Sequence, residues 1–166
     1  MVTEEAACIC TKGLGRGLEK GRSFAQITAS SLYAACRERG VPTTLDDVAA
    51  ASGVRRDEIA KCYRLLVNEF DLKIPIADPA EYVAKVAAKT RANTCVQQKA
   101  LEILSKAEKA GLISGRDPIG VAASALYLAS LLDGERLTQG NVAEAAGVGE
   151  ATVRNEYRRM KKVVRM

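Results

Sequence analysis

The densest run of cationic side chains lies at the carboxyl end of the chain. From Arg154 to Met166 the sequence has six Lys or Arg residues and a single acidic residue, Glu156. Two kinds of chemistry explain such a run. The cations can lie on a solvated helix face, where they complement the helix dipole, or they can bind the phosphates of a nucleic acid. Taken alone, the run favours the solvated face.

A short pattern before this run predicts two helices joined by a tight turn. An alanine is followed four residues later by a glycine, and six residues after that by a β-branched residue. A helix-turn-helix needs a small residue where the two helices cross and a residue tolerant of unusual backbone angles in the turn. It also needs an apolar residue on the second helix that packs against the first. The pattern occurs twice, as Ala143, Gly147 and Val153 and as Ala49, Gly53 and Ile59. We therefore expect a helix-turn-helix in each half of the chain.

The second of these units has side chains that suit the major groove of DNA. At the start of its last helix, Ala151 and Thr152 are short, and Arg154 can donate two hydrogen bonds to a guanine. The cations expected to meet phosphates are Arg158, Arg159, Lys161 and Lys162. The equivalent stretch of the first unit mixes both signs of charge, with Arg55, Arg56, Asp57, Glu58 and Lys61. The second unit is therefore the predicted DNA reader.

Both units lie inside a longer internal repeat. Residues 21–66 align with residues 115–160 without a gap, at an offset of 94 positions. The shared pairs include Gly21/Gly115, Arg22/Arg116, Ala29/Ala123, Ser30/Ser124, Leu32/Leu126, Tyr33/Tyr127, Gly53/Gly147 and Tyr63/Tyr157. A repeat of this length lets each copy bury a core of its own. We expect two domains, residues 1–72 and residues 73–166.

Both copies are predicted to be all-helical, with their helices in the same order. The first copy is expected to have helices at about 4–15 and 23–38 and two more that begin near Thr44 and Asp57. The second copy is expected to have helices at about 96–110 and 118–132, where Asp117 and Pro118 mark the start, and two more that begin near Thr138 and Glu150.

One segment has no partner in the repeat. A proline-bearing linker at residues 71–79 leads into an amphipathic helix at residues 80–90, and neither has a counterpart in the first copy. We therefore expect the first copy to lack its opening helix. Sequence is expected to be missing at the amino end, through natural shortening, a partial gene or an engineered fragment.

Composition limits the remaining chemistry. The chain has no histidine and an odd number of cysteines, five, which we expect to be reduced. Cys8 and Cys10 have no second pair in metal-binding spacing, so neither a metal nor a cofactor is expected. Without a phosphate loop or a histidine for acid–base work, no enzyme is predicted. The longest run without charge, residues 118–132, is too short to span a bilayer, so a soluble intracellular protein is expected.

Three blocks of the sequence resemble the carboxy-terminal core of archaeal transcription factor B, the counterpart of eukaryotic general transcription factor IIB. They are residues 21–54, 71–83 and 115–162. The resemblance implies two tandem cyclin-like folds, normally of five helices each, that bind the TATA-box-binding protein on double-stranded promoter DNA. It further implies a transcription initiation factor in the cytoplasm of an archaeal cell, associated with the nucleoid.

The resemblance also implies roles for particular residues. The second helix-turn-helix would read the element upstream of the TATA box through Ala151, Thr152 and Arg154. The turn before the first central helix, at Gly21 and Arg22, would approach DNA downstream of the box. Ala151 offers only a methyl contact, so weak sequence preference is expected at that base step.

The chain departs from the family in lacking the zinc ribbon and reader segment that engage RNA polymerase. Polymerase recruitment by this chain alone is therefore not expected. Other functions stay open: a cyclin-like adaptor that binds a protein without reading DNA, a one-component repressor, or a shortened paralogue that competes with the full-length factor. The cationic last helix separates them, because a pure adaptor has no need of these cations beside a helix-turn-helix.

Overall fold

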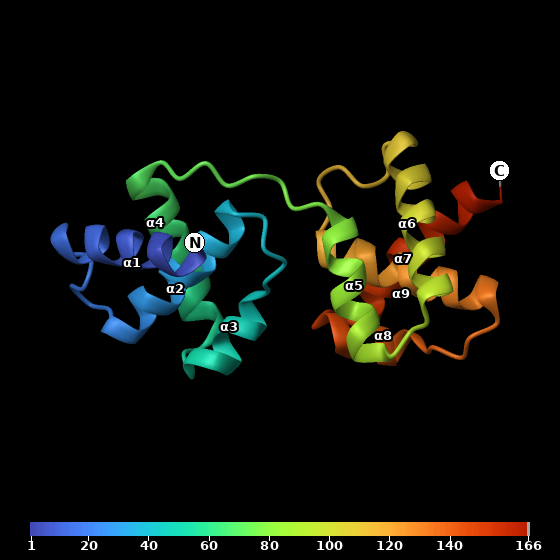
Figure 1. Cartoon of the computed structure of the whole chain (residues 1–166), viewed down its shortest axis with the longest axis horizontal. Coiled ribbons are helices and arrows are strands. Elements are labelled where there is room, and N and C mark those ends of the chain that lie inside the picture. The colour runs from blue at the N-terminus through green and yellow to red at the C-terminus, as the bar shows by residue number, and fades with distance from the viewer. Residues whose placement is uncertain (166) are drawn as a thin grey trace. The chain divides into compact units, whose positions relative to one another are not determined.

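The computed structural model describes residues 1–165, which form nine α-helices and no β-strand (Figure 1). Met166, the last residue of the predicted second domain, lies outside the described residues. The helices are α1 (Val2–Gly15), α2 (Phe24–Glu38), α3 (Leu45–Ser52), α4 (Arg56–Phe70), α5 (Pro79–Thr90), α6 (Thr94–Lys109), α7 (Pro118–Asp133), α8 (Gln139–Ala146) and α9 (Glu150–Val164). The prediction of an all-helical fold is confirmed.

Contacts divide the chain into two compact units, which are separated between Ala77 and Asp78. Unit 1 contains α1 to α4, and unit 2 contains α5 to α9. The division lies inside the proline-bearing linker between α4 and α5. Each unit buries apolar side chains of its own, among them Ile27 and Leu66 in unit 1 and Val121 and Leu126 in unit 2.

The internal repeat is visible in matched contacts inside the two units. The Ser30 hydroxyl of α2 donates to the carbonyl of Ile59 on α4 at 3.2 Å, and the Ser124 hydroxyl of α7 donates to the carbonyl of Val153 on α9 at 3.2 Å. Two edge-to-face tyrosine pairs also correspond: the ring centroids of Tyr33 and Tyr63 lie 4.8 Å apart, and those of Tyr127 and Tyr157 lie 5.2 Å apart. The central helix of each unit therefore holds its last helix in the same way.

Local sequence explains where the shorter helices begin and end. The Thr44 hydroxyl accepts from the backbone N–H of Asp47, and Thr138 makes the equivalent bond to Asn141, so each begins a helix with a capping box. Both helices end at a glycine in the left-handed conformation, a region that L side chains rarely adopt.

The central helix of unit 2 begins where the sequence predicts. Asp117 stands directly before α7, with Pro118 in the first turn, but the Asp117 carboxylate makes no capping hydrogen bond.

Unit 2 has one helix more than unit 1. Helix α5 begins after Asp78, whose carboxylate caps the backbone N–H of Ala80, and it contacts α6, α7 and α8. Among residues 1–77, no helix takes the corresponding place on α1, α2 and α3. Within residues 1–77 the structure thus has four helices where residues 78–165 have five.

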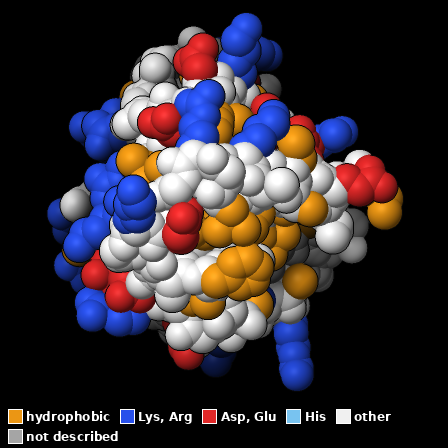
Figure 2. Space-filling view, turned by 90° about the vertical axis from the view of Figure 1, so that its left-hand side faces the viewer, with side chains coloured by type: hydrophobic (Ala, Val, Ile, Leu, Met, Phe, Trp, Pro, Cys, Tyr) orange, Lys and Arg blue, Asp and Glu red, His pale blue; other side chains and the backbone are white. Residues whose placement is uncertain are grey.

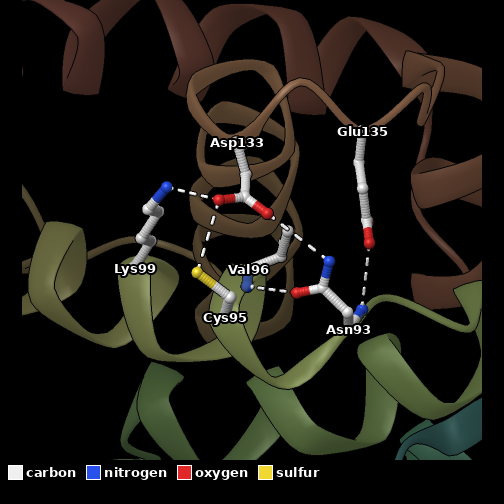
Figure 3. Close-up of polar contacts among 6 residues, drawn as sticks. All are labelled: Asn93, Cys95, Val96, Lys99, Asp133 and Glu135. Atoms are coloured by element: carbon white, nitrogen blue, oxygen red, sulfur yellow. Dashed lines mark hydrogen bonds and ion pairs between the residues drawn. The ribbon is translucent and has the colours of Figure 1, made fainter.

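A polar cluster joins the start of α6 to the end of α7 (Figure 3). The Asp133 carboxylate accepts from the Lys99 ammonium, from the Cys95 thiol at 3.3 Å and from the Asn93 amide at 3.4 Å. Asn93 also caps α6 through the backbone N–H of Val96 at 2.8 Å. The repeat places Glu5 and Arg39 at the positions of Lys99 and Asp133, and they also form an ion pair. The two repeats thus share one ion-pair position, with the signs of charge reversed.

The Asp133 cluster makes a testable prediction about acid stability. The pKa of Asp133 is lowered, first by the hydrogen bond from Lys99 and then by those from Cys95 and Asn93. A lowered folded-state pKa adds stability that is complete above the unfolded value, about 3.9, and is lost as pH falls through the lower folded value. Asp133→Asn should therefore lower the Tm of unit 2 by a constant amount between about pH 5 and 7. The difference from wild type should shrink below about pH 4, and calorimetry across this range checks it.

Candidate nucleic-acid interface

Helices α8 and α9 of unit 2 form the helix-turn-helix. Ala143 on α8 and Val153 on α9 are buried, the latter at 0% exposure, so both lie in the core of unit 2. Gly147 ends α8 with a φ of +68°, which reverses the chain within three residues before α9 begins at Glu150. All three residues therefore occupy the structural roles that the spacing predicts. In unit 1, Gly53 has a φ of +70° and Ile59 is fully buried in the same way.

The start of α9 lies against the central helix α7. A Cβ atom at Gly120 would come within 3.0 Å of the Thr152 methyl group, so this glycine permits the close approach of the two helices. Farther along α9, the nearly buried carboxylate of Glu156 lies 3.3 Å from the Arg116 guanidinium and 3.9 Å from that of Arg159. These contacts fix which face of α9 points outward.

The outward face of α9 is a stripe of exposed residues at helical spacing, which we call the outer stripe. It consists of Ala151, Arg154, Asn155, Arg158 and Lys162. Ala151, Arg154, Arg158 and Lys162 follow one another at intervals of three or four residues, and Asn155 lies four residues after Ala151. Such spacing places all five side chains on one side of a helix. The stripe therefore begins with a short side chain, continues with an arginine and an amide, and ends with two cations.

Two neighbouring side chains contact the guanidinium of Arg154 and orient it. Its Nε donates to the side-chain oxygen of Gln139 on α8 at 3.4 Å, and its guanidinium lies 4.0 Å from the Glu150 carboxylate. Its side chain remains 46% exposed. These long contacts leave the planar donor edge accessible, so the guanidinium can still make the paired hydrogen bonds that a guanine accepts.

Other residues that the sequence assigns to DNA lie beside the outer stripe. Thr152 is half-buried and directs its methyl group toward Gly120. The guanidinium of Arg159 pairs with Glu156, and the Lys161 ammonium lies over the Tyr157 ring, 5.5 Å from its centroid. These three side chains are therefore partly engaged inside unit 2.

Gly21 and Arg22 lie in unit 1, in the turn between α1 and α2. Gly21 has a φ of +79°, and the Arg22 guanidinium donates to the carbonyl of Leu18 at 3.2 Å and to that of Lys20 at 3.5 Å. Arg22 is half-buried and closes its own turn. The repeat-equivalent Arg116 instead pairs with Glu156, so the two arginines support their units through different contacts.

The helix-turn-helix of unit 1 has its cations paired with acids of the same unit. Arg55 lies 2.9 Å from the Asp57 carboxylate, and Arg56 lies 3.2 Å from that of Asp46. These pairs offset charge that would otherwise attract phosphates. The five residues of the outer stripe include no acid, although Arg154 lies 4.0 Å from the carboxylate of Glu150, one turn earlier on α9.

The described residues offer little that would hold a metal. Within residues 1–165, no three Cys, Asp or Glu side chains gather closely enough to bind one. All five cysteines are free, and Cys36 and Cys62 are buried in unit 1. Over the same part of the chain, no helix is long and apolar enough to cross a membrane.

The fold places this chain among proteins built from two tandem helical repeats, each of which ends in a helix-turn-helix. Comparison with protein families identifies the repeat, because residues 1–69 and 72–163 both match the transcription factor TFIIB repeat. This chain belongs to the TFIIB family.

Individual relatives agree with the family assignment. The chain is 49% identical over 159 residues to the transcription initiation factor IIB of Archaeoglobus fulgidus, which covers 96% of this chain and 49% of the relative. It is 45% identical over 159 residues to the factor of the same name from Saccharolobus shibatae, covering 96% of this chain and 52% of that protein. The chain therefore spans about half the length of the curated relatives it matches.

Proposed function

We propose that this chain acts in transcription initiation by binding a complex of the TATA-box-binding protein and promoter DNA. Unit 2 would read the element upstream of the TATA box in the major groove through α9. The observation that carries the proposal is the outer stripe, where Ala151, Arg154 and Asn155 stand at the start of the helix and Arg158 and Lys162 follow on the same face. A recognition helix uses its first residues for base edges and its later cations for phosphates.

The two units would bind different partners, unit 1 mainly a protein and unit 2 mainly DNA. The acid-paired cations in the helix-turn-helix of unit 1 favour a protein partner over phosphates for that surface. By the family resemblance, unit 1 would contribute most of the contact with the TATA-box-binding protein, and its turn at Gly21 and Arg22 would approach DNA downstream of the box. Because Arg22 already donates to two carbonyls, its part would be to hold the backbone of this turn in place.

Arg154→Ala tests the base-reading step. The variant should lose about 1 to 3 kcal/mol of discrimination at one base pair of the upstream element, because a paired arginine–guanine contact is removed. The measurement is the affinity for the promoter complex with the TATA-box-binding protein, on a set of promoters that differ by single base pairs upstream.

Lys162→Ala is the matched control for this experiment. It removes a cation from the same stripe, so it should weaken binding to every promoter by a similar factor and leave the order of preference unchanged. If Arg154→Ala also kept the wild-type order of preference, Arg154 would have no role in reading bases.

A further inference from the structure

The contacts of Arg154 use one edge of its guanidinium. The Nε donates to the side-chain oxygen of Gln139 at 3.4 Å, and Nη2 lies 4.0 Å from the Glu150 carboxylate. Nε and Nη2 share one edge of the planar fork of donors, whereas Nη1 and Nη2 form its end. The end therefore stays free, and its two parallel N–H groups match the O6 and N7 acceptors of guanine.

Gln139 is placed for this contact by the start of α8. It is the first residue of the helix, where the backbone is fixed because the Thr138 hydroxyl accepts from the backbone N–H of Asn141 at 3.1 Å. Gln139 is half-buried, and its side chain reaches from α8 to α9 across the helix-turn-helix. A neutral amide accepts from the arginine without adding a negative charge that would repel phosphates.

The neighbouring Gly140 makes room for the contact with Glu150. A Cβ atom at Gly140 would lie 2.7 Å from a carboxylate oxygen of Glu150 and would displace it. In unit 1 the equivalent positions hold Asp46 and Arg56, whose side chains pair with each other at 3.2 Å. Because Gly140 has no side chain, Glu150 instead lies near Arg154, one turn later on α9.

The amide acceptor and the arginine occur together in one repeat only. Unit 1 has Leu45 where unit 2 has Gln139, and Ala60 where unit 2 has Arg154. Leu45 instead packs against the core of unit 1. Figure 2 faces the end of unit 1 and shows hydrophobic side chains at its centre, with charges of both signs around them. The pair of Gln139 and Arg154 is therefore particular to the unit that carries the outer stripe.

We propose that Gln139 is a specificity-determining residue of the second helix-turn-helix and acts by positioning Arg154. By accepting from Nε, it turns the end of the guanidinium toward the base pair and limits the rotamers of the free arginine. An arginine with fewer rotamers to lose gains affinity where guanine is present and gains none where it is absent. This inference rests on the proposed reading of DNA by α9 and adds a residue from outside that helix.

Affinity measurements on the promoter complex test this role. They use the full chain, the TATA-box-binding protein and the same single upstream base changes that test Arg154→Ala. Gln139→Ala should reduce the preference for guanine by about threefold to tenfold, the effect of one hydrogen bond. Affinity for promoters without that guanine, the salt slope and the Tm should stay at wild-type values, because Gln139 is half-buried and uncharged.

Two further substitutions at this position test the geometry. Gln139→Glu keeps an acceptor at the same reach and should retain the preference, although its charge lowers affinity for all DNA. Gln139→Asn is one methylene group shorter, so it should lose the contact as alanine does. In the free chain, NMR should show faster exchange of the Arg154 Nε–H with water in Gln139→Ala and Gln139→Asn than in the wild type.

A double substitution separates positioning from direct contact with a base. In a chain that already carries Arg154→Ala, Gln139→Ala should change the preference no further, because it acts through the arginine. A further loss of preference would make Gln139 a direct reader of a base and would overturn the proposal.

Two other results would also overturn it. If Arg154→Ala lost the preference for guanine and Gln139→Ala kept it, base reading by α9 would stand, but Gln139 would have no part in it. If Arg154→Ala itself kept the wild-type preference, the proposed base reading would fail, and the role of Gln139 would fail with it.

Discussion

Val153→Asp is expected to unfold unit 2. The Val153 side chain is fully buried, and the backbone carbonyl of Val153 accepts a hydrogen bond from the Ser124 hydroxyl on the central helix α7. The substitution removes about 1.5 to 3 kcal/mol of apolar burial and leaves a carboxylate without a partner, which costs several kcal/mol more. The sum is comparable with the whole stability of a small domain, roughly 5 to 15 kcal/mol.

Thermal unfolding followed by circular dichroism measures this effect. The variant should lose the helical signal of unit 2 at ambient temperature and retain that of unit 1, because the two units have separate cores. Asn155→Asp is the control, since it introduces the same charge two residues away on the exposed side of α9. It should unfold at the wild-type temperature. A Val153→Asp protein with the wild-type Tm would show that α9 does not pack on α7 as described.

Arg158→Ala combined with Lys162→Ala is expected to give the largest loss of DNA affinity. Each phosphate contact contributes a slope of about −0.9 to the dependence of log K on log salt. Removing two contacts should reduce the slope by about 1.8 and weaken binding on the order of a hundredfold at about 50 mM salt. The loss should be the same on specific and unrelated DNA, because phosphates carry no sequence information.

The repeat supplies a control for this pair. Arg64 of α4 is the equivalent of Arg158, and Lys61 lies one turn before it, also exposed. Replacing both by alanine makes the same change in net charge within unit 1. If that variant lowered the salt slope as much as the α9 variant does, phosphate binding would not be specific to the outer stripe.

The fold follows from sequence signals that act over short distances. Thr44 and Thr138 begin helices because each finds a partner three residues ahead, and Gly53 and Gly147 end them because their backbones turn left-handed. The offset of 94 residues then extends every such signal from one unit to the other. The unpaired segment at 80–90 also predicts α5, because its apolar residues recur at helical spacing.

The site was less predictable, because side-chain direction depends on contacts distant in sequence. The sequence places Thr152 on the outside of α9, yet its methyl group points at Gly120, and nothing in the pattern marks that glycine as a close approach. Arg22 and Arg116 align in the repeat, but one binds carbonyls in its own turn and the other pairs with Glu156, forty residues away. The identity shared by the repeats fixes their register, whereas the contacts of aligned charges such as Arg22 and Arg116 differ.

Assembly on promoter DNA is the most direct test of the proposed function. The chain would be titrated in a gel-shift experiment onto a TATA promoter fragment, with and without the TATA-box-binding protein, using an intact or a scrambled upstream element. We expect a slower-migrating complex that requires the TATA-box-binding protein and that weakens when the upstream element is scrambled. A folded chain that forms no such complex, or one indifferent to the upstream element, would contradict the assignment of promoter reading to α9.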